Sequence, residues 1–340
     1  MDSIPAPILQ VPVAGLPSIP AGRTGGKIET QELLLEEAHQ MILKQFPKMR
    51  SFLVVREGQL IWERYYNGHT ASSLNDLRSA TKSFTSTLIG IGMNRGDLPG
   101  PDTHVKSLLA CYAPQREDPL LERVTLHHLL TMTAGFYWKT GKKLGEAFIP
   151  RFHRSRSWAR FAMRLPVQEE MFGRFQYRST DSHLLSAVLS ESTGKDAYSY
   201  ARAHLFEPLG ISHVAWPSSP DGHTMGHVGL ALTSRDLAKF ALCCLDGGRW
   251  EGQPLIPTAW LKTAHAVHAE GYPAFGNYGY QWWTGRINEA DFVCAHGHGG
   301  QQVYLLPGQN AAVIFTADSK VSRWKNPRSL LQRYILPAMQ

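Results

Sequence analysis

A serine and a lysine three residues apart, Ser79 and Lys82, are the first side chains in this sequence that could perform covalent chemistry. On a helix, this spacing places the hydroxyl and the amine about one turn apart on the same face. A serine hydroxyl becomes a good nucleophile when a neighbouring base takes its proton, and desolvation can lower the pKa of a lysine enough for that task. The apolar run after Lys82 carries its ammonium into a packed interior, where an unpaired charge is costly. The pair therefore predicts a lysine-activated nucleophile, at a helix start whose amides could stabilise an oxyanion.

Tyr177 is the second candidate, and it stands in the polar segment 175–181 (FQYRSTD), before a helix expected to begin near Ser182. A tyrosine in a polar loop is most often a half-buried aromatic without a catalytic role. If the fold brings Tyr177 beside Ser79 and Lys82, its phenol could relay a proton or act as the base.

The third candidate is the glycine-rich segment 295–301 (AHGHGGQ), which precedes an apolar run. Glycines allow a backbone to pass close to a ligand and to present its N–H groups. A bulge at the edge of a strand would give the same glycine pattern without any function.

The elements that must position these residues follow from apolar periodicity. Helical spacing is found at residues 29–46, 77–96, 124–133, 182–193, 197–205, 234–245 and 327–337. Strand-like runs are found at residues 51–55, 60–66, 282–283, 292–295, 302–306 and 311–316. The segment 77–96 is apolar on most faces, which predicts a helix buried on nearly all sides. Ser234 is the expected N-cap of the helix 234–245.

This order, with strands at both ends of the chain and helices in the middle, predicts an α+β fold. One antiparallel sheet would be built from both chain ends, flanked by helices, and would enclose an inserted, mostly helical domain. We expect an extended arm over 1–26 and a catalytic domain over 27–340. Within that domain, the α/β part spans about 27–75 and 230–340, and the helical part spans about 76–229.

Composition indicates a globular protein, with 43% hydrophobic and 19% charged residues in 340. The net charge of +7 is concentrated in residues 139–164, where eight basic residues face one acid, Glu146. Aromatic residues interleave with these basic ones, as in some nucleic-acid sites. A solvated surface of the helical domain near the active-site cleft explains the same pattern, and we expect no nucleic-acid partner.

The amino-terminal residues lack a secretory pattern, and no apolar run is long enough for a membrane helix. The four cysteines form no C-x-x-C pair, so neither a disulfide framework nor a thiolate zinc site is indicated. We therefore expect a cytoplasmic protein without a membrane partner. The histidine pairs 127/128, 223/227 and 265/268 lack a third ligand, so we expect no metal site and no cofactor.

The three candidate segments, in this order, resemble the serine β-lactamase and penicillin-binding-protein-like superfamily. Within it, the likeness is to the branch of class C β-lactamases, esterases and 6-aminohexanoate-dimer hydrolases. The stretches that carry the resemblance are LRSATKSFTSTLIGIGMNRGDL, VTLHHLLTMTAGF, FQYRSTDSHLLSAVLSESTGKDAYSYARAHLFEPLGI, LALTSRDLAKFALCCLDGGRW, YGYQWW and GHGGQQVYLLPG. They lie within residues 50–318, and the Ser-x-x-Lys element is a known signature of β-lactamases and penicillin-binding proteins.

The resemblance implies a role for each candidate. Ser79 is similar to the acylated nucleophile, Lys82 to its base or base partner, and Tyr177 to the tyrosine that shares proton transfer with the lysine. Gly297 is similar to the glycine of the third-motif strand, so the backbone N–H of His298 would pair with that of Ser79 as the oxyanion hole. The remaining positions implied to bind substrate are Ser179, Ala295, His296, Gly297 and Gly299.

Two positions depart from the family pattern. Ser179 stands where the family often has asparagine, which shortens a hydrogen-bonding side chain near the substrate amide. Ala295 stands where β-lactamases carry the lysine of Lys-Thr-Gly, so a cation that would recognise a carboxylate is missing there. This second departure favours an esterase or amidase over a β-lactamase or a D-Ala peptidase.

The sequence thus predicts a serine hydrolase that cleaves a small-molecule ester or amide through an acyl-enzyme on Ser79. An acyltransferase that uses the same acyl-enzyme, a β-lactamase or D-Ala peptidase, and a catalytically silent binding or scaffold protein are the alternatives. A homodimer is a further expectation.

Overall fold

The computed structural model describes residues 26–115, 117–141 and 143–340. The arm expected over residues 1–26 therefore lies outside the described residues, apart from Gly26, which begins helix α1 (Gly26–Gln45). No helix in the described part of the chain combines the length and the apolar character needed to cross a lipid bilayer.

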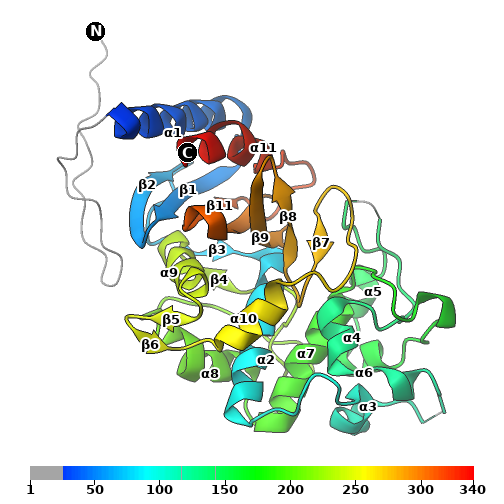
Figure 1. The fold of residues 1–340 in the computed structure, drawn as a ribbon. Helices are drawn as coiled ribbons and strands as arrows, with labels where there is room; N and C mark the ends of the chain where they lie inside the picture. The colour runs from blue at the N-terminus through cyan, green and yellow to red at the C-terminus, as the bar shows by residue number, and fades with distance from the viewer. Residues whose placement is uncertain (1–25, 116, 142) are drawn as a thin grey trace.

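One antiparallel sheet of seven strands organises the molecule, and both ends of the chain contribute to it (Figure 1). In spatial order its strands are β2 (Gln59–Tyr65), β1 (Met49–Arg56), β11 (Ala311–Ala317), β10 (Gln301–Leu306), β9 (Ala290–Gly297), β8 (Trp283–Ile287) and β7 (Asn277–Tyr278). The amino-terminal hairpin joins the carboxy-terminal strands where β1 pairs with β11, with Val54 opposite Val313. The predicted α+β fold, with its sheet built from both chain ends, is confirmed.

Helices cover both faces of the sheet, which explains why the central strands β11 and β10 are buried along their whole length. On β1, Phe52 and Val54 pack in the core beneath α1 and the carboxy-terminal helices, whereas Leu53 and Val55 pack in the core beneath α2 (Thr81–Arg95) and α9 (Ser234–Leu245). The carboxy-terminal segment expected as one helix is divided into α11 (Arg328–Leu330), a π-helical turn (Leu331–Ile335) and α12 (Leu336–Ala338).

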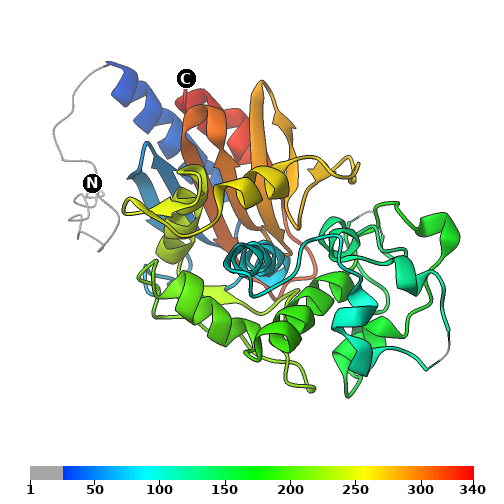
Figure 2. The ribbon, with the colours of Figure 1, turned by 60° about the horizontal axis from the view of Figure 1, so that its bottom comes forward.

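Between the two parts of the sheet, the chain forms a mostly helical layer. It contains α3 (Val105–Leu108), α4 (Leu126–Thr131), α5 (Ile149–His153), α6 (Trp158–Met163), α7 (Ser179–Thr193) and α8 (Ala197–Ala201). Helix α10 (Thr258–His265) and the short hairpin of β5 (Arg249–Trp250) and β6 (Gln253–Pro254) follow α9. Figure 2 shows α2 nearly end-on, between the sheet and the green helices.

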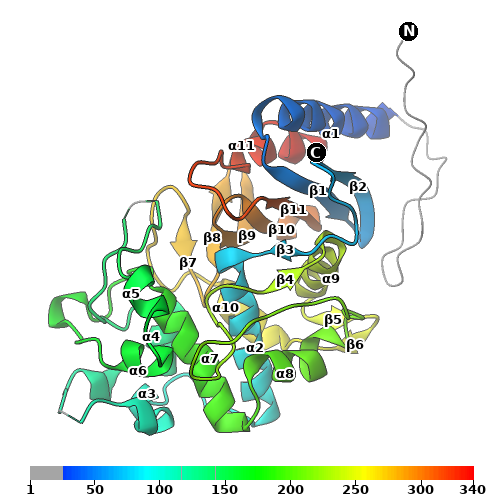
Figure 3. The ribbon, with the colours of Figure 1, turned by 180° about the vertical axis from the view of Figure 1, so that it is seen from behind.

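The chain leaves the first part of the sheet through β3 (Asn75–Asp76) and returns through β4 (Ala231–Leu232), and these two short strands pair (Figure 3). Helix α9 begins one residue earlier than its predicted cap implies. Its N-cap is Thr233, whose hydroxyl accepts from the Asp236 amide, so the prediction of Ser234 as the cap was wrong. The two hydroxyl residues are adjacent, and the Ser234 hydroxyl instead bonds to Ser51 of β1.

Candidate active site

Ser79 lies in a short 3₁₀ turn, Arg78–Ala80, that leads directly into α2. The residue is half-buried. Arg78 has a φ of 49°, a left-handed conformation that is uncommon and strained for a non-glycine residue. Asp76 supports this conformation, because its carboxylate accepts from the Arg78 amide at 2.9 Å.

Strand β9 lies against this turn because residue 297 is a glycine. A Cβ atom at Gly297 would lie 2.1 Å from the Leu77 carbonyl oxygen and 3.2 Å from the Ala80 nitrogen, so any side chain would force the strand away. The glycine was predicted to let the backbone approach a ligand, and in the structure it lets β9 approach the turn that carries Ser79. His298 follows on the hairpin between β9 and β10, and its ring is exposed and bonded to the Val321 carbonyl at 2.6 Å.

Lys82 is almost fully buried, with 1% of its side chain exposed, and its Nζ lies within hydrogen-bond distance of three oxygens. These are Ser79 Oγ at 3.2 Å, Ser179 Oγ at 3.2 Å and the His227 carbonyl at 3.0 Å. Burial lowers the pKa of Lys82 to about 8. The negative charges of Glu146 and Asp181 oppose this shift and the positive charge of Arg78 adds to it.

Ser179 connects Lys82 to a carboxylate that sequence reasoning missed. The Glu146 carboxylate accepts from the Ser179 amide and the Ser179 hydroxyl, both at 2.6 Å, and from the Trp138 indole at 2.8 Å. Burial raises the pKa of Glu146, while Lys82 and these donors oppose that rise. Three donors around one carboxylate favour its ionised form. The signal for Glu146 was its isolation, since it is the one acid in the basic segment 139–164.

Tyr177 is buried beside these groups, as the hypothesis of a catalytic tyrosine required. Lys82 Nζ lies 4.9 Å from the centre of the Tyr177 ring. The Trp283 ring stacks on the Tyr177 ring, with 5.9 Å between the ring centres. Burial and then the negative charge of Glu146 raise the pKa of the Tyr177 phenol well above its usual range, although a side-chain hydrogen bond with Ser79 opposes the shift. The phenol is therefore protonated at neutral pH.

A buried ion pair fixes the backbone that presents Tyr177 and Ser179. The expected polar loop ends sooner than predicted, because Ser179–Asp181 already form the first turn of α7. Arg178 Nε bonds to both oxygens of the Asp181 carboxylate, at 3.2 and 3.1 Å, and both side chains are fully buried. Burial raises the pKa of Asp181 to about 6, against the opposing effect of Arg178.

Gln281 locks α2 and α7 together behind the site, and sequence reasoning gave it no role. Its carbonyl accepts from Ser83 of α2 at 2.8 Å, and its side-chain oxygen accepts from Ser182 of α7 at 2.5 Å. Its amide nitrogen donates to the carbonyls of Leu129 and Leu130, at the end of α4. The only sequence signal was its place in the YGYQWW stretch.

The residues implied to bind substrate differ in their burial and in the groups that they contact. Ala295 is 0% exposed and packs in the core, so it offers no surface to a substrate, contrary to the expectation for this position. His296 is also buried, where it bonds to Gln302, and Gly299 contacts the segment at Asp318. Ser179 faces Lys82 and Glu146 rather than an open cavity. The Gly297 backbone adjoins the turn that carries Ser79.

The paired histidines contact aromatic and histidine side chains. His127 bonds to Tyr280, His223 bonds to Tyr112, and His227 bonds to His153 through its ring while its carbonyl accepts from Lys82. Among the residues that the structure describes, no three His, Cys, Asp or Glu side chains are grouped so that they could hold a metal ion.

Known proteins resemble this chain in sequence and in fold. A family described as "Beta-lactamase" matches residues 43–331. The chain is 25% identical, over 300 residues, to a 6-aminohexanoate-dimer hydrolase from Paenarthrobacter ureafaciens, with 82% of this chain and 73% of the relative covered.

Solved structures agree with this likeness at the level of the fold. An octameric penicillin-binding protein homologue from Pyrococcus abyssi superposes with a TM-score of 0.67 at 20% identity, covering 91% of this chain and 76% of that one. A penicillin-binding protein homologue from Caulobacter crescentus superposes with a TM-score of 0.69 at 17% identity, covering 94% and 99%. Because the family match extends over most of the sequence, the chain belongs to the beta-lactamase family, as its motifs predicted.

Proposed function

We propose that this protein is a serine hydrolase that cleaves a small ester or amide through an acyl-enzyme on Ser79. The observation that carries the proposal is the contact of 3.2 Å between the half-buried Ser79 hydroxyl and the buried Lys82 amine. A buried lysine with a pKa of about 8 is a competent base near neutral pH, which an exposed lysine is not.

The partners of Lys82 orient its lone pair toward Ser79. The His227 carbonyl can only accept a hydrogen bond, so it takes one N–H of the neutral amine. The Ser179 hydroxyl donates to the ionised Glu146, so Ser179 Oγ accepts the second N–H. The remaining tetrahedral position of Nζ points at Ser79 Oγ, and it is the lone pair. Glu146 thus acts as a positioning residue through Ser179.

The reaction then follows from the protonation states. Ser79 Oγ attacks the carbonyl carbon and its proton passes to Lys82. The protonated Tyr177 phenol donates to the leaving alcohol or amine and recovers a proton from Lys82. The backbone N–H groups of Ser79 and His298 stabilise the tetrahedral oxyanion, a contribution that is commonly worth 10²- to 10³-fold in rate. Water releases the acid by the reverse proton route and restores Ser79.

The substrate that we propose carries no obligatory anionic group at strand β9. Ala295 supplies no cation there, and its methyl group is buried in the core. The name of the relative from Paenarthrobacter ureafaciens, a hydrolase of the 6-aminohexanoate dimer, supports hydrolysis as the reaction class. We therefore expect kcat/KM for p-nitrophenyl butyrate to exceed that for a chromogenic cephalosporin, at low and at high salt.

Covalent labelling tests the nucleophile. A fluorophosphonate probe should add one adduct per chain, located on Ser79 by peptide mass analysis, and Ser79→Ala should lose both the adduct and esterase turnover. Ser86→Ala is the matched control, because Ser86 lies farther along α2 and its buried hydroxyl has no hydrogen-bond partner among the described residues. An adduct that persists in Ser79→Ala, or disappears in Ser86→Ala, contradicts the assignment.

A further inference from the structure

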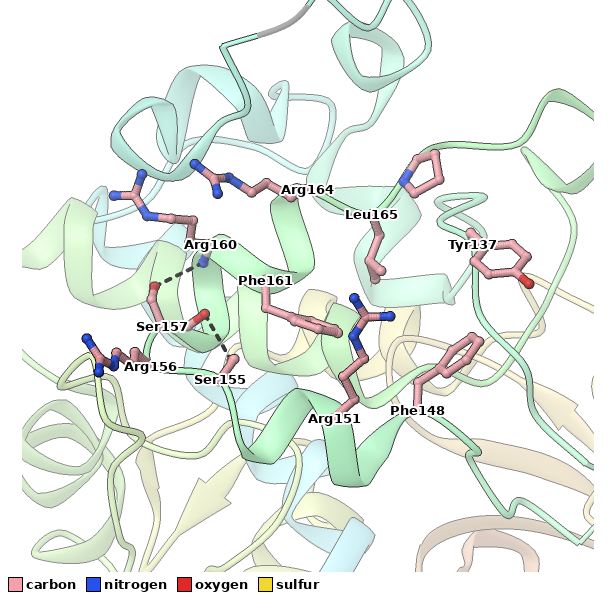
Figure 4. A pocket seen from close by; sticks show the side chains of 11 residues that line it. Tyr137, Phe148, Arg151, Ser155, Arg156, Ser157, Arg160, Phe161, Arg164 and Leu165 are labelled. Atoms are coloured by element: carbon pink, nitrogen blue, oxygen red, sulfur yellow. Dashed lines mark hydrogen bonds between the residues drawn. The ribbon is translucent and has the colours of Figure 1, made fainter.

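A second cavity lies in the helical layer, and none of the candidate catalytic residues lines it. Its volume is about 650 Å³, within the range of pockets that hold a small organic molecule. It is formed by α5, α6 and the segments beside them, within the basic segment 139–164 and its flanks (Figure 4). Ser79, Lys82 and Tyr177 are absent from its walls, so it is a separate feature from the site described above.

Four arginines line this cavity, Arg151, Arg156, Arg160 and Arg164, and no acidic residue does. Within the described ranges, the guanidinium groups of Arg151, Arg156 and Arg164 have no hydrogen bond or ion pair, and Arg160 donates to the Cys111 carbonyl at 3.1 Å. Arg160 and Arg164 are four residues apart, and Figure 4 shows them side by side. Like charges at this spacing repel each other, so an anion between them would relieve the repulsion.

The apolar part of the cavity is aromatic. Phe148, Phe161 and Tyr137 line it, and the Arg151 side chain extends between the two phenyl rings in Figure 4. The Tyr137 and Phe148 rings are 5.7 Å apart between centres, and both retain exposed surface. Rings gathered around one cavity suit the body of a single small molecule, whereas single-stranded nucleic acid requires stacking platforms along an extended groove.

We propose that this cavity binds an organic anion with a flat aromatic or compact apolar body and a carboxylate, sulfonate or phosphate group. The body packs against the aromatic rings that line the cavity, those of Tyr137, Phe148 and Phe161. The anionic group accepts from the arginines, whose planar forks match the oxygens of such groups. The binding site is independent of the reaction proposed for Ser79.

Calorimetric titration of the full chain with 2-naphthoate, and with the neutral 2-naphthamide, tests the charge requirement. We expect 2-naphthoate to bind with one site per chain and at least roughly tenfold more tightly than 2-naphthamide, and its affinity should fall as salt is added. Equal affinities for the two compounds, or no binding of 2-naphthoate at millimolar concentrations, would overturn the proposal.

Substitutions of residues that line the cavity test whether 2-naphthoate binds there. Arg151→Gln and Arg164→Gln should each weaken 2-naphthoate binding by roughly tenfold, and Phe161→Ala should weaken both compounds. Arg154→Gln is the matched control, because Arg154 belongs to the same basic segment but bonds to the Pro150 carbonyl and does not line the cavity. Ser79→Ala should bind as the wild type does. A loss in Arg154→Gln equal to that in Arg151→Gln would show that net charge, not the cavity, attracts the anion, and would overturn the assignment.

Discussion

Two cationic side chains are buried near the start of neighbouring helices, Lys82 in α2 and Arg178 just before α7, and their surroundings differ. Arg178 has its counterion in direct contact, since both oxygens of Asp181 lie within 3.2 Å. Lys82 contacts only uncharged oxygens, and its nearest carboxylate, Glu146, is separated from it by the Ser179 hydroxyl.

This difference distinguishes a cation that stabilises the fold, Arg178, from an amine proposed to take part in the reaction, Lys82. The Arg178 guanidinium stays charged and forms a direct ion pair with the Asp181 carboxylate. This ion pair fixes the backbone between Tyr177 and α7. An amine that is buried among neutral acceptors gains little from its charge, and burial lowers the pKa of Lys82 to about 8. A guanidinium stays charged in any case, whereas an amine without a contacting carboxylate can lose its proton, as the proposed role of Lys82 requires.

Replacement of Lys82 should produce the largest effect on activity. Lys82→Met removes the base, and Lys82→Arg supplies a group that cannot deprotonate, so kcat/KM for p-nitrophenyl butyrate should fall roughly 10⁴-fold or more in both. The melting temperature of Lys82→Met should stay the same or rise, because an apolar side chain avoids the cost of burying the amine. A Lys82→Met protein that is clearly destabilised would place Lys82 with Arg178 as a structural cation.

Tyr177→Phe removes the phenolic proton and keeps the ring packed on Trp283. Loss of a general acid should lower kcat/KM by roughly 10²- to 10⁴-fold, with little change in thermal stability. The effect should be greater for substrates with poor leaving groups, because these need protonation most. Wild-type kcat/KM in Tyr177→Phe would reduce Tyr177 to a packing residue.

Asp181→Asn should act on stability, since it leaves Arg178 as a buried cation without its counterion. Breaking such a pair commonly costs about 3–5 kcal/mol, which urea titration would measure as a lower free energy of unfolding. The double replacement Arg178→Met/Asp181→Leu should recover much of that loss, because neither charge is then buried. If Asp181→Asn were as stable as the wild type, the proposed contrast between the two cations would fail.

The pH dependence of kcat/KM should give the smallest and most specific effect. Because Lys82 must be neutral to accept the Ser79 proton, kcat/KM should rise about tenfold per pH unit below pH 8 and level off above it. The negative charge of Glu146 raises the pKa of Lys82, so Glu146→Gln should move this rise to lower pH by up to about one unit. It should also lower the plateau, because one of the two carboxylate oxygens that accept from Ser179 and Trp138 becomes an NH2 donor.

Arg78→Gln serves as the opposite control. The positive charge of Arg78 lowers the pKa of Lys82, so its removal should move the rise in kcat/KM to higher pH. Profiles of both variants that coincide with the wild-type profile would show that Lys82 is not the titrating group.

The sequence was sufficient for the long helices, for the main strands of the sheet and for residues that are close in sequence, whereas the short helices α3, α5, α6 and α10 were not predicted. Helical spacing predicted α1, α2 and α9, and the placement of strands at both ends predicted the joint sheet. Ser79 and Lys82 are three residues apart, so local geometry alone brings them together. The contact of Tyr177 with them depends on tertiary packing, and only the resemblance to a family anticipated it.

The missed parts of the site are those that no local rule can place. Glu146 reaches Ser179 from an irregular segment, and His227 contributes its backbone carbonyl, which is independent of its side chain. The burial of Ala295 depends on which face of β9 it occupies once α2 has packed against the sheet. These features become visible only when segments distant in sequence are assembled.

The pairing of β1 with β11 also governs when the site can form during synthesis. Residues 54 and 313 must meet before the sheet is closed, and β9 can hold Gly297 against the Leu77 turn only within that sheet. Contacts between such distant segments slow folding, and the helices made in between must wait with apolar faces uncovered. Ser79 is therefore translated in the first quarter of the chain, but the proposed oxyanion hole can form only after the last strand has left the ribosome. A prematurely terminated chain would carry Ser79 and Lys82 without it.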